Sequence, residues 1–125
     1  MPKTRLYHNP RCSKSRETLA LLRERGVEPE ISLYLESPPG VAELEQIARA
    51  LDREPLEFMR TQEPLFRELG LGRHDLRTRD EWLALLAQHP VLLERPIFVV
   101  GAKARLGRPP EAVLEILPAQ KRPQS

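Results

Sequence analysis

The chain has 125 residues, which is enough for one compact domain and too few for two independent cores of ordinary size. Its 20 basic and 18 acidic side chains leave a formal net charge of +2, which disfavours a strongly basic nucleic-acid platform. No apolar run approaches the roughly 18 residues that would span a bilayer, and the N-terminal stretch lacks the apolar segment of a secretory signal. We therefore expect a protein of the reducing cytoplasm that binds neither nucleic acid nor membrane.

The first third of the chain predicts a β-α-β unit. Residues 4–8 form the first expected strand, and residues 30–35 form the second, with Ile31, Leu33 and Leu35 alternating onto one face. Residues 13–25 predict a helix, because apolar side chains gather on one side and Gly26 follows where a left-handed cap is needed. Two strands joined by a helical crossover are expected to lie parallel.

Residues 40–90 predict a helical block. Apolar side chains recur at helical spacing from Val41 to Leu51. Pro55 and Pro64 suit first helical positions, where a missing N–H costs nothing. Thr78 with Glu81 three residues later has the pattern of a capping box, so a further helix is expected to begin there and to end before Pro90.

The last part of the chain predicts a β-hairpin and a final helix. Residues 96–100 and 104–106 are the expected strands, and Pro109 and Pro110 begin the helix. The order β-α-β, helices, β-β-α matches an α/β, thioredoxin-like fold with an insertion at about 40–90. We expect a single domain over residues 1–118, with 119–125 as a flexible tail.

Cys12 is the only cysteine, so it has no disulfide partner within the chain. It lies in a loop, residues 8–16, of which seven of nine are polar or charged, at the expected N-terminus of the first helix. Unpaired N–H groups and the helix dipole favour an anion at that end. Nearby cations lower a thiol pKa further, and His8 and Arg16 lie within four residues of Cys12. The loop therefore predicts a reactive thiolate and an oxyanion site.

The residues around Cys12 disfavour other interpretations of this cysteine. A buried, inert thiol is the commonest alternative, but a loop this polar is poor company for one. A dithiol oxidoreductase needs a second cysteine at position 15, which is Ser15. A phosphatase loop needs arginine at position 18, which is Thr18. The three histidines lie far apart in sequence, so no metal site is expected.

Several ordered motifs make the chain resemble the glutaredoxin-coupled arsenate reductase family. The resemblance covers about residues 4–117, and the opening loop is its most diagnostic part. The motifs are Tyr7-His8-Asn9-Pro10-x-Cys12-x-x-Ser15-Arg16, Leu33-Tyr34-Leu35-Glu36 with Pro38-Pro39, His89-Pro90, Arg95-Pro96-Ile97 and Gly107-Arg108-Pro109 with Glu111.

The resemblance implies that the Cys12 thiolate attacks arsenate. Glutathione, as a co-substrate and not a bound cofactor, then reduces the adduct to arsenite, and glutaredoxin resolves the mixed disulfide. The lone cysteine agrees independently, because the later sulfurs must come from outside the chain. His8, Ser15 and Arg16 are the residues expected to support the thiolate.

The resemblance also assigns three arginines to the oxyanion: Arg60, Arg95 and Arg108. A guanidinium is permanently charged, and its planar fork matches a tetrahedral anion. Arg105 is a nearby rival of Arg108, and the sequence leaves open which of the two faces the site. Pro96 is the expected cis-proline beside the cysteine.

Two further functions stay open at this level. The same scaffold serves Spx-like transcription regulators that bind RNA polymerase, and Ser15 in place of a second cysteine would make such a regulator insensitive to redox state. A glutathione-dependent reductase of another substrate is the other alternative. Near-neutral charge and the lack of an evident heptad make a monomer the default expectation.

Overall fold

The computed structural model describes residues 3–72 and 74–118, so the expected tail at 119–125 lies outside the described residues. It has four strands, four α-helices and three 3₁₀ helices within those ranges. In chain order they are β1 (Thr4–Tyr7), α1 (Ser13–Glu24), β2 (Glu30–Ser32), α2 (Val41–Leu51), η1 (Pro55–Phe58), α3 (Pro64–Glu68), α4 (Arg79–Gln88), η2 (Pro90–Leu92), β3 (Ile97–Val100), β4 (Lys103–Leu106) and η3 (Pro110–Ile116).

The four strands form one mixed sheet in the order β2-β1-β3-β4. β1 and β2 are parallel, as the helical crossover predicts, and β1 pairs antiparallel with β3. β3 and β4 form the expected hairpin around Gly101, which has a positive φ. This arrangement is the thioredoxin-like fold expected from the order of the elements.

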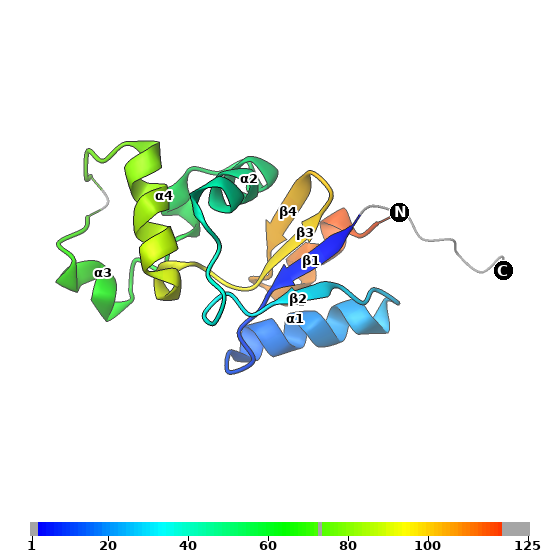
Figure 1. The fold of residues 1–125 in the computed structure, drawn as a ribbon. Coiled ribbons are helices and arrows are strands. Elements are labelled where there is room, and N and C mark those ends of the chain that lie inside the picture. Colours follow the sequence, from blue (N-terminus) through cyan, green and yellow to red (C-terminus); the bar gives the residue numbers. More distant parts are fainter. Residues whose placement is uncertain (1–2, 73, 119–125) are drawn as a thin grey trace, which may run out of the picture.

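Helices lie on both sides of the sheet (Figure 1), and each face of the sheet packs into its own hydrophobic cluster. Leu6 and Phe98 point to the face covered by α1 and η3, whereas Tyr7 and Ile97 point to the face covered by the helical insertion. Neighbouring residues on one strand thus serve opposite layers, as the two-residue period of a strand requires. The site loop, between β1 and α1, lies at one end of this sandwich.

The insertion has the expected helical character, and its local signals are satisfied. Thr78 and Glu81 exchange the two hydrogen bonds of a capping box at the start of α4. Pro55, Pro64 and Pro90 each lie in the first turn of a helix. In the described part of the chain, no helix is long and apolar enough to cross a membrane.

Two elements differ from their predictions. β2 ends at Ser32, and the chain turns at Leu33 instead of continuing as a strand, because the N–H groups of Glu36 and Ser37 both donate to the Leu33 carbonyl. Leu35 is consequently exposed and Tyr34 is buried, the reverse of the expected alternation. The last helix, η3, is a 3₁₀ helix, beginning where Pro109 and Pro110 offer no N–H donors.

Candidate active site

Cys12 is the residue immediately before α1, and its backbone is extended there. Its carbonyl accepts the hydrogen bond from the N–H of Arg16, while its own N–H donates to the carbonyl of Asn9. These two hydrogen bonds anchor Cys12, and the residue is partly exposed. The first N–H groups of the helix are free of intrahelical partners and are directed toward this end.

The loop before Cys12 is held by a buried serine. Ser15 is fully buried, and its hydroxyl lies 2.6 Å from Nδ1 of His8. The N–H of Asn9 donates to the same hydroxyl at 3.0 Å. Burial, followed by the positive charges of Arg23 and Arg16, lowers the pKa of His8. A neutral His8 can accept a hydrogen bond from the Ser15 hydroxyl, so these two side chains hold the loop together. The backbone N–H of Ser15, in contrast, acts on the Cys12 sulfur itself.

The side chains of two basic residues of the loop, Arg16 and Lys14, contact groups other than the sulfur. Arg16 donates from Nη1 to the carbonyl of Pro10 at 2.9 Å, which braces the loop. Lys14 lies 3.6 Å from a carboxylate oxygen of Glu17, one turn further along the helix. The sequence predicted Arg16 as a residue that supports the thiolate through its charge, and the hydrogen bond it makes in the structure is with the main chain.

Several groups act on the Cys12 thiol in opposite directions. Partial burial on its own raises the pKa, but the backbone N–H groups of Ser15 and Lys14 and the guanidinium of Arg95 lower it. The net result is a thiol pKa below its ordinary value. The helix N-terminus therefore contributes as predicted, while the decisive side-chain charge comes from Arg95, more than 80 residues away in sequence.

Arg95 reaches the cysteine from the segment that leads into β3. The Arg95–Pro96 peptide bond is cis, and Pro96 is buried. The Arg95 side chain is mostly shielded, with 15% of its surface exposed, and its Nε has no hydrogen-bond partner. Its Nη1 lies 3.4 Å from a carboxylate oxygen of Glu94. A buried guanidinium with an unpartnered N–H is a ready donor for an anion.

Arg108 lies beside Arg95, and Arg105 does not. Nη1 of Arg108 donates to the Arg95 carbonyl at 3.1 Å, and its Nε lies 3.8 Å from Glu94. Arg105 pairs with Glu115 of η3 at 3.2 Å. Arg108 is thus in contact with Arg95 and lies near Glu94, whereas Arg105 lies at the interface between β4 and η3.

Arg60 is brought to the same region by a short piece of main-chain pairing. Met59 and Leu93 form an antiparallel bridge, the N–H of Arg60 donates to the Leu92 carbonyl at 2.7 Å, and the N–H of Glu94 donates to the Phe58 carbonyl at 2.9 Å. The Arg60 guanidinium lies 2.9 Å from Glu63. This pairing places the segment that carries Arg60 beside the segment that carries Arg95.

Gly107 packs tightly between two parts of the site. A Cβ at this position would lie 2.6 Å from Pro96 Cγ and 2.6 Å from Thr18 Oγ1. Thr18 is fully buried in α1, and the Gly107 N–H donates to the Pro96 carbonyl at 2.9 Å. Only glycine permits this approach, which fixes the segment carrying Arg108 against both the cis-proline and the cysteine helix.

The sequence and the fold of this chain match those of a known protein family. The model of the ArsC family matches residues 7–116. The chain belongs to the ArsC family.

The chain is 50% identical over 114 residues to YfgD of Escherichia coli K12, described as an uncharacterized protein. The match covers 90% of this chain and 95% of that one. It is 49% identical over 113 residues to a Haemophilus influenzae protein named arsenate reductase, with coverage of 90% and 97%. The structure of an arsenate reductase from Vibrio cholerae superposes with a TM-score of 0.88 at 49% identity, with coverage of 93% and 98%.

Two residues of this ArsC site were not predicted as site residues. Tyr34 is buried, and this burial raises its pKa to about 12. The charges of Arg95 and Arg60 act on the Tyr34 pKa in the opposite direction, whereas that of Cys12 also raises it. Glu94 contacts both Arg95 and Arg108. Tyr34 lies in one of the motifs that carried the resemblance, so its signal was present. Glu94 had no sequence signal beyond being next to Arg95.

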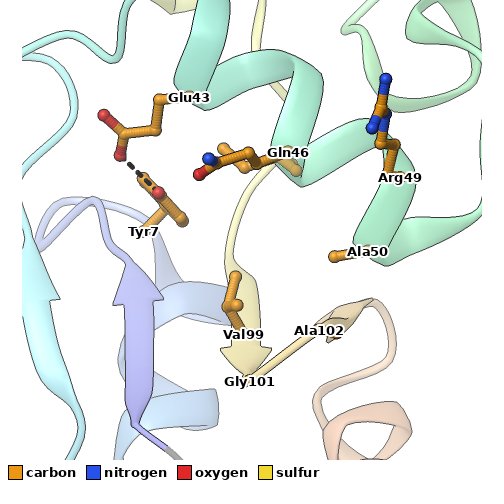
Figure 2. Close-up of a pocket in the computed structure, with 9 residues that line it drawn as sticks. Tyr7, Glu43, Gln46, Arg49, Ala50, Val99, Gly101 and Ala102 are labelled. Atoms are coloured by element: carbon orange, nitrogen blue, oxygen red, sulfur yellow. Dashed lines mark hydrogen bonds between the residues drawn. The ribbon is translucent and has the colours of Figure 1, made fainter.

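A separate cavity of about 330 Å³ lies between α2 and the sheet (Figure 2). Glu43 and Gln46 of α2 face Tyr7 of β1 there, and the Tyr7 hydroxyl donates to the Glu43 carboxylate. Neither Cys12 nor the three arginines line this cavity. It is therefore distinct from the cysteine site of the ArsC domain.

The lowered pKa of Cys12 leads to a pH-dependent prediction. Alkylation of the thiol by iodoacetamide depends on the thiolate, so the midpoint of rate against pH is expected to lie below that of free cysteine. Arg95→Ala removes a positive charge that lowers the pKa, so the midpoint is expected to move to higher pH. Arg105→Ala, which removes a guanidinium paired with Glu115, is the matched control and leaves the midpoint in place. A wild-type midpoint at or above that of free cysteine would contradict the assignment.

Proposed function

We propose that this protein is an arsenate reductase, an oxidoreductase whose nucleophile is Cys12. The observation that carries the proposal is the state of Cys12. The residue is partly exposed, backbone N–H groups and Arg95 lower its pKa, and Arg108 lies against Arg95. Relatives named arsenate reductase at 44–49% identity over most of the chain support the substrate.

In the first step, the Cys12 thiolate attacks arsenic. A bond forms between Sγ and arsenic, and one arsenate oxygen leaves as water after taking up protons from solvent, so the arsenic stays in the pentavalent state. Two anions must approach each other in this step. Arg95, Arg108 and Arg60 reduce that repulsion, and the fork of each guanidinium suits the oxygens of a tetrahedral ion.

The second step needs an external thiol, which the cysteine count requires. Reduction of arsenic from the pentavalent to the trivalent state takes two electrons, and two thiols supply two electrons when they become a disulfide. This chain has one cysteine. Glutathione attacks Sγ, the bond between Sγ and arsenic breaks with its electron pair going to arsenic, and arsenite leaves. The product is a mixed disulfide between Cys12 and glutathione.

Glutaredoxin then restores the enzyme by attacking the glutathione sulfur, which releases the Cys12 thiolate. His8 and Ser15 hold the loop so that the N–H groups of the helix face the sulfur throughout the cycle. A cycle that uses glutathione suits the reducing cytoplasm. We propose that the protein works there as a monomeric single domain over residues 1–118 and without a bound cofactor.

The arginine assignment predicts a graded mutational result. Arg95→Ala and Arg108→Ala are each expected to raise the KM for arsenate by roughly tenfold or more, because each loses charge-assisted hydrogen bonds to the anion. Arg105→Ala is expected to change the KM by less than about twofold, since this side chain pairs with Glu115. Arsenite release in the presence of glutathione and glutaredoxin is the measurement.

The same assay decides the proposed function. Wild-type protein that releases no arsenite would refute the activity. Equal effects of Arg105→Ala and Arg108→Ala on KM would refute the placement of Arg108 at the oxyanion while leaving the activity itself intact.

A further inference from the structure

One acidic side chain lies within the cluster of basic ones. Oε1 of Glu94 lies 3.4 Å from Nη1 of Arg95 and 3.8 Å from Nε of Arg108. Among the residues described by the structure, Glu94 is the only carboxylate that forms an ion pair with either of these arginines. It therefore lies where a bound oxyanion and the two guanidiniums would meet.

The position of Glu94 is fixed by the main chain. Its N–H donates to the Phe58 carbonyl at 2.9 Å, and the neighbouring pair Met59 and Leu93 forms a β-bridge. The Arg95 N–H also donates to Oε1 of Glu94 at 3.3 Å. The side chain is 24% exposed, so it is shielded from solvent much more than an ordinary surface glutamate. A carboxylate held in this way is part of the site and not a solvated neighbour of it.

The chemistry of a carboxylate differs from that of its basic neighbours. An ionised carboxylate only accepts hydrogen bonds, whereas a guanidinium only donates them. A tetrahedral anion that keeps a proton can satisfy both, because its bare oxygens accept from arginine and its hydroxyl donates to the carboxylate. An anion without a proton brings one of its oxygens against another acceptor, and like charges then repel each other.

We propose that Glu94 is a specificity-determining residue of the oxyanion site, which accepts a hydrogen bond from the protonated oxygen of the anion and so selects arsenate or phosphate against sulfate. Arsenate and phosphate carry at least one hydroxyl under mildly alkaline conditions, and sulfate carries none. Phosphate and sulfate then have the same charge, and they differ at this site mainly in the proton. The inference rests on the proposed oxyanion site, but it does not require turnover.

The test measures how well inorganic phosphate and sulfate protect Cys12 from iodoacetamide in the full chain. Wild-type protein is expected to bind phosphate roughly tenfold more tightly than sulfate, the size of one charge-assisted hydrogen bond. Glu94→Gln is expected to bring this ratio close to one, because its amide can donate to sulfate. Glu94→Ala removes the acceptor without adding a donor, and it is expected to lower the ratio of phosphate affinity to sulfate affinity as well. Glu115→Gln, which removes the carboxylate paired with Arg105, is the control and leaves the ratio unchanged.

Two results would overturn the inference. Equal protection of wild-type protein by phosphate and sulfate would do so without any variant, so the test does not depend on how the variants fold. An undiminished preference for phosphate in folded Glu94→Gln would do so as well. Failure of the proposed function has a different signature, namely a wild-type preference for phosphate with no arsenite released from arsenate.

Discussion

Replacing Cys12 by serine is expected to abolish arsenite release, by a factor on the order of a thousand or more. The serine hydroxyl is almost the same size as the thiol, so the loop and its hydrogen bonds are retained. It does not ionise near neutral pH, however, and it cannot take part in the disulfide that supplies electrons to arsenic. The measurement is arsenite release with glutathione and glutaredoxin present. Omission of either reductant is expected to stop sustained turnover of the wild type.

A matched control tests whether a small change elsewhere in the same loop also lowers arsenite release. Ser13 is exposed and lies next to Cys12, so Ser13→Ala changes a neighbouring hydroxyl without removing the thiol, and it is expected to retain most of the activity. Undiminished turnover by the Cys12→Ser variant would remove the mechanism altogether. Sustained turnover without an external thiol would remove the glutathione step alone.

Substitution of Gly107 by alanine is expected to lower both stability and activity. The new methyl group would meet Pro96 Cγ and Thr18 Oγ1 at 2.6 Å, closer than side-chain atoms normally approach. Thr18 has little freedom to move, because it is fully buried and its hydroxyl donates to the Lys14 carbonyl at 2.8 Å. Overpacking of this kind typically costs about 1–3 kcal/mol. Denaturant unfolding measures the free energy, and the KM for arsenate reports the displacement of Arg108.

Gly72→Ala is the appropriate comparison for this change. A Cβ at Gly72 would meet no atom within 4 Å, so the free energy of unfolding is expected to change by less than about 0.5 kcal/mol. If both variants unfold at the same denaturant concentration as the wild type, the close packing at Gly107 is not a constraint on the site.

The parts of the site that depend on neighbouring residues were predictable from the sequence. The position of Cys12 follows from a strand, a polar loop and a helix start, each of which has a local signal. The left-handed conformation of Gly26 and the capping box of α4 were likewise visible as short patterns. Such features are decided within a few residues, so spacing alone carries the information.

The rest depends on which distant segments meet. The charge that acts most directly on Cys12 comes from Arg95, and the choice between Arg105 and Arg108 depended on the path of the chain after β4. The early end of β2 arises from a turn around Leu33 that alternation cannot reveal. The place of Glu94 in the site could not be predicted, because it depends on the contacts of its carboxylate with both Arg95 and Arg108.

The pairing of residues 58–60 with residues 92–94 also bears on how this domain can vary. The chain leaves the pairing after Arg60 and returns to it at Leu92. The segment 61–91 is therefore an insertion whose two ends are held together by backbone hydrogen bonds. Insertions or deletions confined to this segment need not shift Arg60 or Arg95. The loops of this segment can therefore change in length while Arg60 and Arg95 keep their places, whereas Phe66, Leu83 and Leu86 are tied to the core by their burial.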